Sequence, residues 1–432
     1  MKNFVSEHRI LALVISGIVV LVVGSVILGS FLLYRIQGIP KPTGTIETSG
    51  CATSSAPKDK TLYVLSKPRS DSTVYISAVD TNGQERWTQN FATLSASFTR
   101  GSLEEKNGLV YAFVTSQVQQ RRQVRPGHTV LQSGKITNIA AAYDANSGNK
   151  LWNMQAPSDD LIEGMSICND MIYLWTGNAI YAYNAKDGSP LWRSNKLTLL
   201  NLPRIVVTNN AIVLTSRGKD IYHVGIYALN PKNGTLLWKV DFPNRNQTGQ
   251  YVALSLTATD KAVYASQFNR GSPQKVNALS ISNGKLLWNT LVNMNIANNF
   301  IRSPSTIVGN NVLYSYTSNT GLFALNVNNG THLWDESNVY QLQPSQDRLY
   351  VTHANSSDLC QLDPTTGKSQ WCKFPIQTGY PIKAVSDQTT LYIASTAGVS
   401  ALQKDNGKIS WVYKGNTSGA ALMEIYGLSL DY

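Results

Sequence analysis

Short apolar segments that alternate with polar or small residues recur along this chain, and each ends in a turn followed by a tryptophan. The clearest copy is Tyr227–Trp238, with the sequence YALNPKNGTLLW. Alternation with a period of two is typical of a half-buried β-strand. An Asn side chain accepts hydrogen bonds from backbone N–H groups ahead of it, and Gly adopts a positive φ without strain. The segment therefore predicts two antiparallel strands joined by a tight hairpin turn.

Further strands are expected before most of these hairpins. Leu313–Tyr316 and Val263–Ser266 are apolar runs that suit a third strand, and Ser305–Val308 suits a fourth. Four antiparallel strands form one blade of a β-propeller. The hydrophobic pattern therefore predicts an all-β protein built from blades.

The number of blades follows from a repeated pair, a glycine and a tryptophan four residues later. Eight of the nine tryptophans obey this rule, and their spacings are 65, 40, 46, 50, 46, 37 and 40 residues. A fixed motif with a period of 40–50 residues is typical of a propeller or solenoid. The pairs are Gly83/Trp87, Gly148/Trp152, Gly188/Trp192, Gly234/Trp238, Gly284/Trp288, Gly330/Trp334, Gly367/Trp371 and Gly407/Trp411. We expect an eight-bladed β-propeller of four-stranded antiparallel blades over residues 61–432.

This repeat resembles the tryptophan-docking repeat of the eight-bladed, pyrroloquinoline quinone (PQQ)-type propellers, a family that includes BamB-like proteins. The family pattern is roughly Ala-x-Asp-x-x-Thr-Gly-x-x-x-Trp. Its alanine position falls on Ala78, Ala142, Ala182, Ala228, Ala278, Ala324 and Ala401, with Gln361 as the exception. The resemblance implies that each indole packs between blades and donates its N–H to a neighbouring carbonyl. The tryptophans and glycines are thus expected to be structural.

The first blade lacks one strand in the sequence that precedes its motif. Leu62–Leu65 and Thr73–Ile76 supply two strands besides the tryptophan strand, whereas 21 residues remain after Trp411. We expect this C-terminal tail to complete the first blade. Such closure removes an exposed sheet edge.

The N-terminal residues differ in character from the rest of the chain. After a short flank at residues 1–9, residues 10–34 carry no charge. A helix of this length spans roughly 37 Å, which is longer than a hydrocarbon core of about 30 Å. Together with the resemblance, this segment predicts an uncleaved single-pass membrane anchor and an extracytoplasmic propeller. Residues 35–60 are rich in Pro, Gly, Ser and Thr, as expected of a flexible linker.

Charge singles out one insertion in the second blade. Lys and Arg exceed Asp and Glu by 37 − 26 = 11. Residues 116–138 explain the long first spacing and carry Arg121, Arg122, Arg125 and Lys135. The insertion is either a solvated basic loop or hairpin, or a surface for a protein or an anionic envelope polymer. No aromatic residues are interleaved with the charges, so nucleic acid is not expected.

The four cysteines allow one local pair. Cys360 and Cys372 flank a single hairpin turn near register, so either a cross-strand disulfide or two buried thiols would fit them. Cys51 and Cys168 have no evident partner in the sequence.

The resemblance leaves two main classes of function open. Quinoprotein dehydrogenases hold PQQ and Ca²⁺ on the ring axis, whereas BamB-like members are non-enzymatic binders. The chain has no adjacent cysteine pair, no Cys-x-x-Cys-His, and no metal-ligand spacing among its five histidines. We therefore expect a non-enzymatic scaffold that binds a protein or envelope partner and has no cofactor. A PQQ-dependent enzyme and an extracytoplasmic ligand sensor are the alternatives, and the sequence does not identify a partner.

Overall fold

The computed structural model describes part of the chain. The described residues are 51, 60–69, 71–94, 98–125, 128–154, 156–157, 160–194, 204–217, 223–243, 253–268, 273–293, 302–309, 311–318, 321–337, 339–344, 348–353, 358–373, 383–396, 398–415 and 423–430. The chain divides into two compact units, residues 1–44 and 45–432, and all described residues belong to the second. The predicted flank and membrane anchor, and most of the predicted linker, lie outside them. Within the described ranges, no helix has the length and apolar character needed to cross a bilayer.

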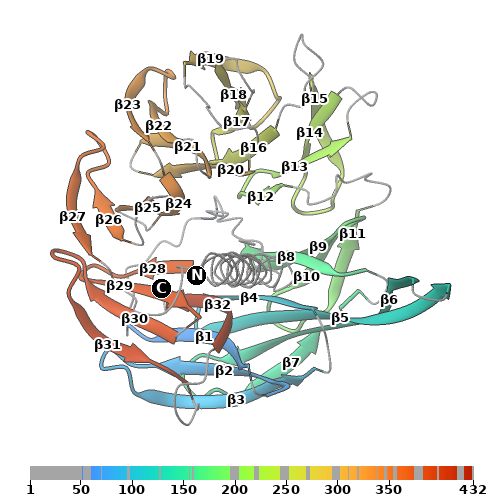
Figure 1. Ribbon diagram of the computed structural model, residues 1–432. Helices are drawn as coiled ribbons and strands as arrows, with labels where there is room; N and C mark the ends of the chain where they lie inside the picture. Colours follow the sequence, from blue (N-terminus) through green and yellow to red (C-terminus); the bar gives the residue numbers. More distant parts are fainter. Residues whose placement is uncertain are drawn as a thin grey trace, which may run out of the picture. The chain divides into compact units, whose positions relative to one another are not determined.

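The described part is an all-β, eight-bladed propeller whose blades are four-stranded antiparallel sheets (Figure 1). The first four blades, from the inner to the outer strand, are β32 (Met423–Leu430), β1 (Leu62–Pro68), β2 (Thr73–Val79), β3 (Glu85–Thr93); β4 (Phe98–Lys106), β5 (Leu109–Arg125), β6 (His128–Asp144), β7 (Lys150–Met154); β8 (Ile162–Cys168), β9 (Met171–Thr176), β10 (Ile180–Asn184), β11 (Pro190–Arg193); and β12 (Ile205–Val207), β13 (Ile212–Arg217), β14 (His223–Leu229), β15 (Leu236–Pro243).

The remaining four blades follow the same order. They are β16 (Ala253–Ala258), β17 (Ala262–Phe268), β18 (Gln274–Ser280), β19 (Leu286–Val292); β20 (Arg302–Gly309), β21 (Val312–Ser318), β22 (Gly321–Asn326), β23 (His332–Ser337); β24 (Val339–Pro344), β25 (Leu349–His353), β26 (Leu359–Leu362), β27 (Ser369–Lys373); and β28 (Lys383–Ser386), β29 (Thr390–Ser395), β30 (Gly398–Gln403), β31 (Ile409–Tyr413). Inner strands of adjacent blades lie beside one another: β4 contacts both β32 and β8, and β28 contacts both β24 and β32.

The hydrophobic core lies between adjacent blades. In one cluster, Val206 and Val213 of blade 4 pack with Ala258 and Val263 of blade 5. This placement explains the alternating pattern, because every second residue of a middle strand faces each neighbouring sheet. The polar residues of the motif make the turn: Asp363 accepts hydrogen bonds from Thr365 and Thr366, which lower its pKa to about 2.

The first blade joins the two ends of the propeller sequence. Strand β32 pairs along the whole of β1, from Leu62 opposite Leu430 to Pro68 opposite Met423. Ile425 and Leu428 are buried and pack with residues of blade 8. The ring is therefore closed by hydrogen bonds between strands more than 350 residues apart in the sequence.

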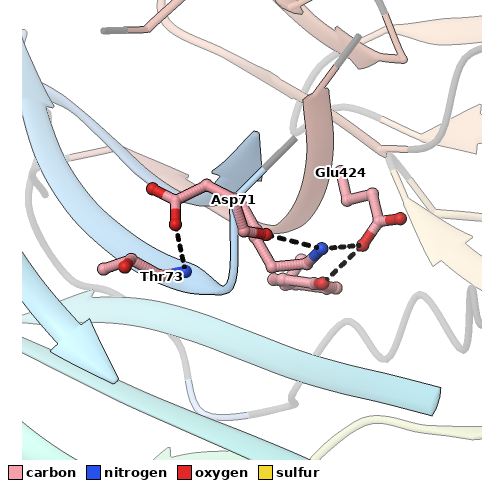
Figure 2. Close-up of polar contacts among 5 residues, drawn as sticks. Asp71, Thr73 and Glu424 are labelled. Atoms are coloured by element: carbon pink, nitrogen blue, oxygen red, sulfur yellow. Dashed lines mark hydrogen bonds and ion pairs between the residues drawn. The ribbon is translucent and has the colours of Figure 1, made fainter. Parts of the chain in front are cut away.

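Polar contacts reinforce this closure where β1 ends and β32 begins. The Glu424 carboxylate of β32 forms an ion pair with the Lys67 ammonium of β1 at 3.2 Å (Figure 2). The same carboxylate accepts a hydrogen bond from the Tyr426 hydroxyl at 2.7 Å. The same ammonium lies 3.4 Å from the Asp71 carbonyl oxygen, and the Asp71 carboxylate accepts the Thr73 N–H at 3.0 Å. The turn between β1 and β2 is thus tied to the last strand of the chain.

Candidate functional site

The eight motif tryptophans lie at the eight blade junctions. Seven of them donate the indole N–H to a backbone carbonyl in the turn of the next blade, at 2.7–3.2 Å. The donor–acceptor pairs are Trp87–Ala145, Trp192–Pro231, Trp238–Ile281, Trp288–Val327, Trp334–Pro364, Trp371–Lys404 and Trp411–Thr81. The Trp152 N–H has no partner among the described residues. The equivalent carbonyl, that of Ala185, accepts the Tyr111 hydroxyl, as the Ala145 carbonyl accepts the Tyr63 hydroxyl beside the Trp87 N–H.

The motif glycines are placed against these rings. Gly284 has a φ of +71°, and a Cβ added there would lie 2.7 Å from the Trp238 ring. A side chain at this position would meet both backbone strain and a clash, which explains the residue type. This geometry gives the tryptophan and glycine set a role in holding adjacent blades together.

All four cysteines form disulfides. Cys360 and Cys372 are direct partners in the register of β26 and β27, with their Cα atoms 4.1 Å apart. Cys51 is bonded to Cys168 at the end of β8, across a sequence separation of 117 residues. The second pair could not be found from the sequence, because the ring brings these residues together only after three blades have formed.

The basic insertion of the second blade is a continuation of its two middle strands. β5 and β6 are 17 residues long each, and their backbone pairing runs from Leu109 opposite Asp144 to Arg125 opposite His128. Figure 1 shows this hairpin extending past the other strands of its sheet. Arg121, Arg122, Arg125 and Lys135 lie on this extended hairpin. The structure thus selects a hairpin over an irregular loop.

The inner strands carry a second set of charges, which the sequence did not single out. Arg100 of β4 and Glu163 of β8 form an ion pair between blades 2 and 3. Glu104 of β4 and Lys383 of β28 attract each other electrostatically, although the inner strand of blade 1 separates their strands. The Glu104 carboxylate also accepts a hydrogen bond from the backbone N–H of Ile167 in β8, on the other side of β4.

Burial governs the ionisation of this pair. Protein atoms surround the Glu104 carboxyl, although it retains some solvent-accessible surface, and burial raises its pKa to about 7 against the attraction of Lys106 and Lys383. Burial likewise lowers the pKa of the Lys383 ammonium, and Glu104 opposes this shift. Glu104 is therefore a carboxyl that titrates near neutral pH at the ring axis.

The inner-strand residues do not fit a PQQ–Ca²⁺ centre. Ca²⁺ takes six to eight oxygen ligands, several of them from carboxylates. Among the described inner-strand carboxylates, Glu163 and Glu424 form ion pairs with Arg100 and Lys67. Glu105 accepts the Gly108 N–H, and Glu104 is attracted by Lys106 and Lys383. In the described ranges, no three His, Cys, Asp or Glu side chains are grouped as metal ligands.

A pH-dependent stability is expected from Glu104. Between its pKa of about 4.5 when unfolded and about 7 when folded, the native state binds more protons than the unfolded state. The free energy of unfolding should therefore fall as the pH rises through this window. The difference corresponds to about 3 kcal/mol. Urea titrations at pH 4.5 and 7.5 should show that the free energy of unfolding falls by this amount more in the wild type than in Glu104→Gln. An equal change with pH in the two proteins would contradict the prediction.

Comparison with known proteins places this propeller in a family. A profile of the family described as outer membrane protein assembly factor BamB matches residues 70–270 and 136–373. The two matches overlap because the profile can align with the repeats in more than one register. Together they cover most of the propeller, and the chain belongs to this BamB-like family of PQQ-type propellers.

Curated relatives are distant and only partly covered. The outer membrane protein assembly factor BamB of Yersinia pestis is 22% identical over 240 residues, which is 50% of this chain and 57% of that protein. Tetrathionate hydrolase of Acidithiobacillus ferrooxidans is 28% identical over 198 residues, which is 40% of this chain and 36% of that enzyme. The chain therefore matches about half of the first relative and about a third of the second.

Solved structures show the same fold at low identity. The computationally designed Ika8 protein has a TM-score of 0.51 at 12% identity, with 83% of this chain and 97% of that chain covered. The quinohemoprotein alcohol dehydrogenase of Comamonas testosteroni has a TM-score of 0.51 at 12% identity, with 74% and 68% covered. These likenesses concern the fold alone, since this fold carries more than one function.

Proposed function

We propose that this protein is a non-enzymatic, membrane-anchored extracytoplasmic propeller that binds a protein or an anionic envelope polymer as a scaffold. Membership of the BamB-like family over most of the propeller is the observation that carries this proposal. The relative from Yersinia pestis is named an assembly factor, which is the function of a binder rather than a catalyst. A rigid ring displaying loops and hairpins suits such a role, because it presents variable segments on a fixed frame.

Two features support the proposed location. The uncharged residues 10–34 are long enough to span a bilayer. Disulfides persist mainly in oxidising compartments, and all four cysteines of this chain are in disulfides. Mass spectrometry of the chain isolated from membranes under alkylating conditions should find residues 1–34 retained and no alkylated cysteine. A chain that begins after residue 34, or four alkylated thiols, would contradict the anchor or the location respectively.

The extended β5–β6 hairpin is the proposed partner surface. It lengthens one blade beyond what a four-stranded unit requires and places three arginines within five residues. Changing Arg121, Arg122 and Arg125 to Gln should weaken capture of native partners at least tenfold, and wild-type capture should decrease with salt. The melting temperature should hardly change, because the three positions lie on the part of the hairpin that extends past the other strands of the sheet, where a charge is expected to contribute little to stability.

The matched control removes three charges elsewhere. Lys186, Lys368 and Lys408 are exposed residues of hairpin turns in other blades, and changing them to Gln gives the same net charge. Capture by this control should resemble the wild type. Equal capture by all three proteins would assign recognition to another surface.

An enzyme is the second candidate, because one relative is named tetrathionate hydrolase and a solved structure of the same fold is a quinohemoprotein alcohol dehydrogenase. Purified protein would be given PQQ with Ca²⁺ and tested by absorbance and dye-coupled alcohol oxidation, and separately given tetrathionate. Turnover in either assay would replace the scaffold proposal with a catalytic one.

A further inference from the structure

The outer strand of every blade has a β-bulge immediately before its docking tryptophan. The bulged residue, which has no partner in the strand register, is a leucine in blades 2 to 6: Leu151, Leu191, Leu237, Leu287 and Leu333. In blades 7, 8 and 1 it is polar: Gln370, Ser410 and Arg86. The five leucines are 41–55% exposed. The bulged position is therefore apolar in five consecutive blades, which we call the apolar arc, and polar in the other three, although blade 8 also exposes Ile409 and Val412, at 40% and 44%.

The apolar arc is densest at blades 4 and 5. Leu236 and Leu286 precede the bulged leucines of these blades, and Leu291 follows on β19 with 65% of its surface exposed. We call Leu236, Leu237, Leu286, Leu287 and Leu291 the leucine rim. The two halves of the rim adjoin, because Gly284 in the turn of blade 5 lies against the Trp238 ring of blade 4. Contiguous exposed apolar side chains are typical of an interaction site, whereas single ones are ordinary.

The bulges argue against an added β-strand as the occupant. A bulge twists an edge strand and interrupts its row of hydrogen-bonding groups, which protects the edge from pairing. Both β15 and β19 carry it at Leu237 and Leu287. The leucines are thus displayed by an edge that is poorly suited to bind a strand of another molecule or of a second copy.

Charge identifies a better occupant. Lys232 and Lys285 are exposed in the turns of blades 4 and 5, each within six residues of the rim leucines of its own hairpin. Lys239, between them in the sequence, is 3.3 Å from Asp241, the one acidic residue of these two hairpins. The rim therefore combines leucines with a net positive charge, in a chain whose net charge is +11. Leucines flanked by lysines match the boundary between acyl chains and anionic headgroups.

We propose that the leucine rim, with Lys232 and Lys285, docks onto the anionic lipid surface of the membrane that anchors the chain. The inference rests on the proposed membrane anchor. Because Cys51 is bonded to Cys168 of blade 3, the free part of the linker is residues 35–50, and 16 residues that behave as a flexible coil span roughly 20–24 Å. Such a tether keeps the rim at high effective concentration beside the bilayer, so a contact that is weak by itself suffices. Docking fixes which side of the ring faces the membrane and leaves blades 7, 8 and 1 away from it.

Lysine footprinting of the full chain tests this docking. The chain would be placed in nanodiscs containing phosphatidylglycerol, in nanodiscs of phosphatidylcholine alone, and in detergent, and then labelled with an acylating reagent. Lys285, Lys368 and Lys408 all follow the motif glycine of their turns and are all exposed. Lys285 should be labelled at least threefold less in the anionic discs than in the other two conditions, whereas Lys368 and Lys408 should be unchanged.

The chain itself supplies a matched variant. Leu286→Ser with Leu287→Gln gives blade 5 the Ser-Gln sequence found before the tryptophan of blade 7. Since both leucines are more than half exposed, the variant should fold and insert normally. It should abolish the protection of Lys285, and Leu286→Met with Leu287→Met should restore it.

Other outcomes separate the alternatives. Unchanged labelling of Lys285 in inserted protein would overturn the rim while leaving the anchor in place. Protection that is equal in detergent and grows with protein concentration would identify a second copy as the occupant and also overturn the proposal. Protein that neither inserts nor co-sediments with anionic vesicles would contradict both the anchor and the rim.

Discussion

Deletion of residues 418–432 is expected to abolish the cooperative fold. The deletion removes β32, whose Met423, Ile425, Leu428 and Leu430 are all buried in the core of the closing blade. Burial of such side chains contributes about 1.5–3 kcal/mol each, or about 6–12 kcal/mol together. That sum is comparable to the whole stability of a typical domain, about 5–15 kcal/mol. Denaturant unfolding followed by circular dichroism should show no sigmoidal transition, and size exclusion should show aggregates.

Two further measurements keep this expectation open to contradiction. Removing only residues 431 and 432 leaves β32 intact and should leave the unfolding midpoint unchanged. A synthetic peptide of residues 418–432 added to the truncated protein should restore a transition, because it can pair with β1. A truncated protein that is monomeric and melts cooperatively without the peptide would show that seven blades and three strands suffice.

Replacing Trp238 by Ala should lower the free energy of unfolding by about 3–5 kcal/mol, the usual cost of truncating a buried aromatic side chain. Trp238 is almost fully buried between blades 4 and 5 and donates its N–H to the Ile281 carbonyl at 2.7 Å. Truncation leaves a cavity over Gly284 and also deprives that carbonyl of its donor. Urea denaturation of the variant and the wild type at one pH measures the difference.

A graded series separates packing from hydrogen bonding at this junction. Trp238→Phe retains most of the ring volume but has no N–H group, so it should cost about 1–3 kcal/mol. Trp152→Ala removes a partly buried ring that has no hydrogen-bond partner among the described residues, and should cost less than Trp238→Ala. A loss below 1 kcal/mol for Trp238→Ala would show that the tryptophan does not hold the blades together.

The eight-bladed ring could be predicted from the sequence because its signal is local and repeated. Each Gly–Trp pair reports one turn with a positive φ and one indole resting on the next turn, so eight pairs count eight blades. A second signal repeats along the chain. An apolar residue followed by tyrosine occurs in seven middle strands, and these tyrosine rings lie 5.8–6.1 Å from the docking tryptophans: Tyr63, Tyr111, Tyr173, Tyr264, Tyr314, Tyr350 and Tyr392.

The charges of the ring axis could not be found in the same way. Glu104 and Lys383 stand 279 residues apart and influence each other electrostatically only because the ring returns blade 8 to the side of blade 1. Nothing in the repeat marks them, since inner strands are its most variable part. The leucine rim could be predicted only in part. Most of its residues belong to the repeated motif, but their exposure follows from the β-bulge before each tryptophan, which the sequence does not reveal.

The Cys51–Cys168 disulfide also determines how a pull on the chain would be carried. A force applied on the N-terminal side of Cys51 reaches blade 3 through the covalent bond at Cys168 before it reaches β1. The hydrogen-bonded seam between β1 and β32 is therefore shielded from the load. The two cysteines are 117 positions apart, so the loop that they close is about 400 Å long when extended, and tension can release it only after reduction of the disulfide. If the propeller is tethered at its N-terminus, this disulfide diverts the applied force away from the β1–β32 pairing that closes the ring.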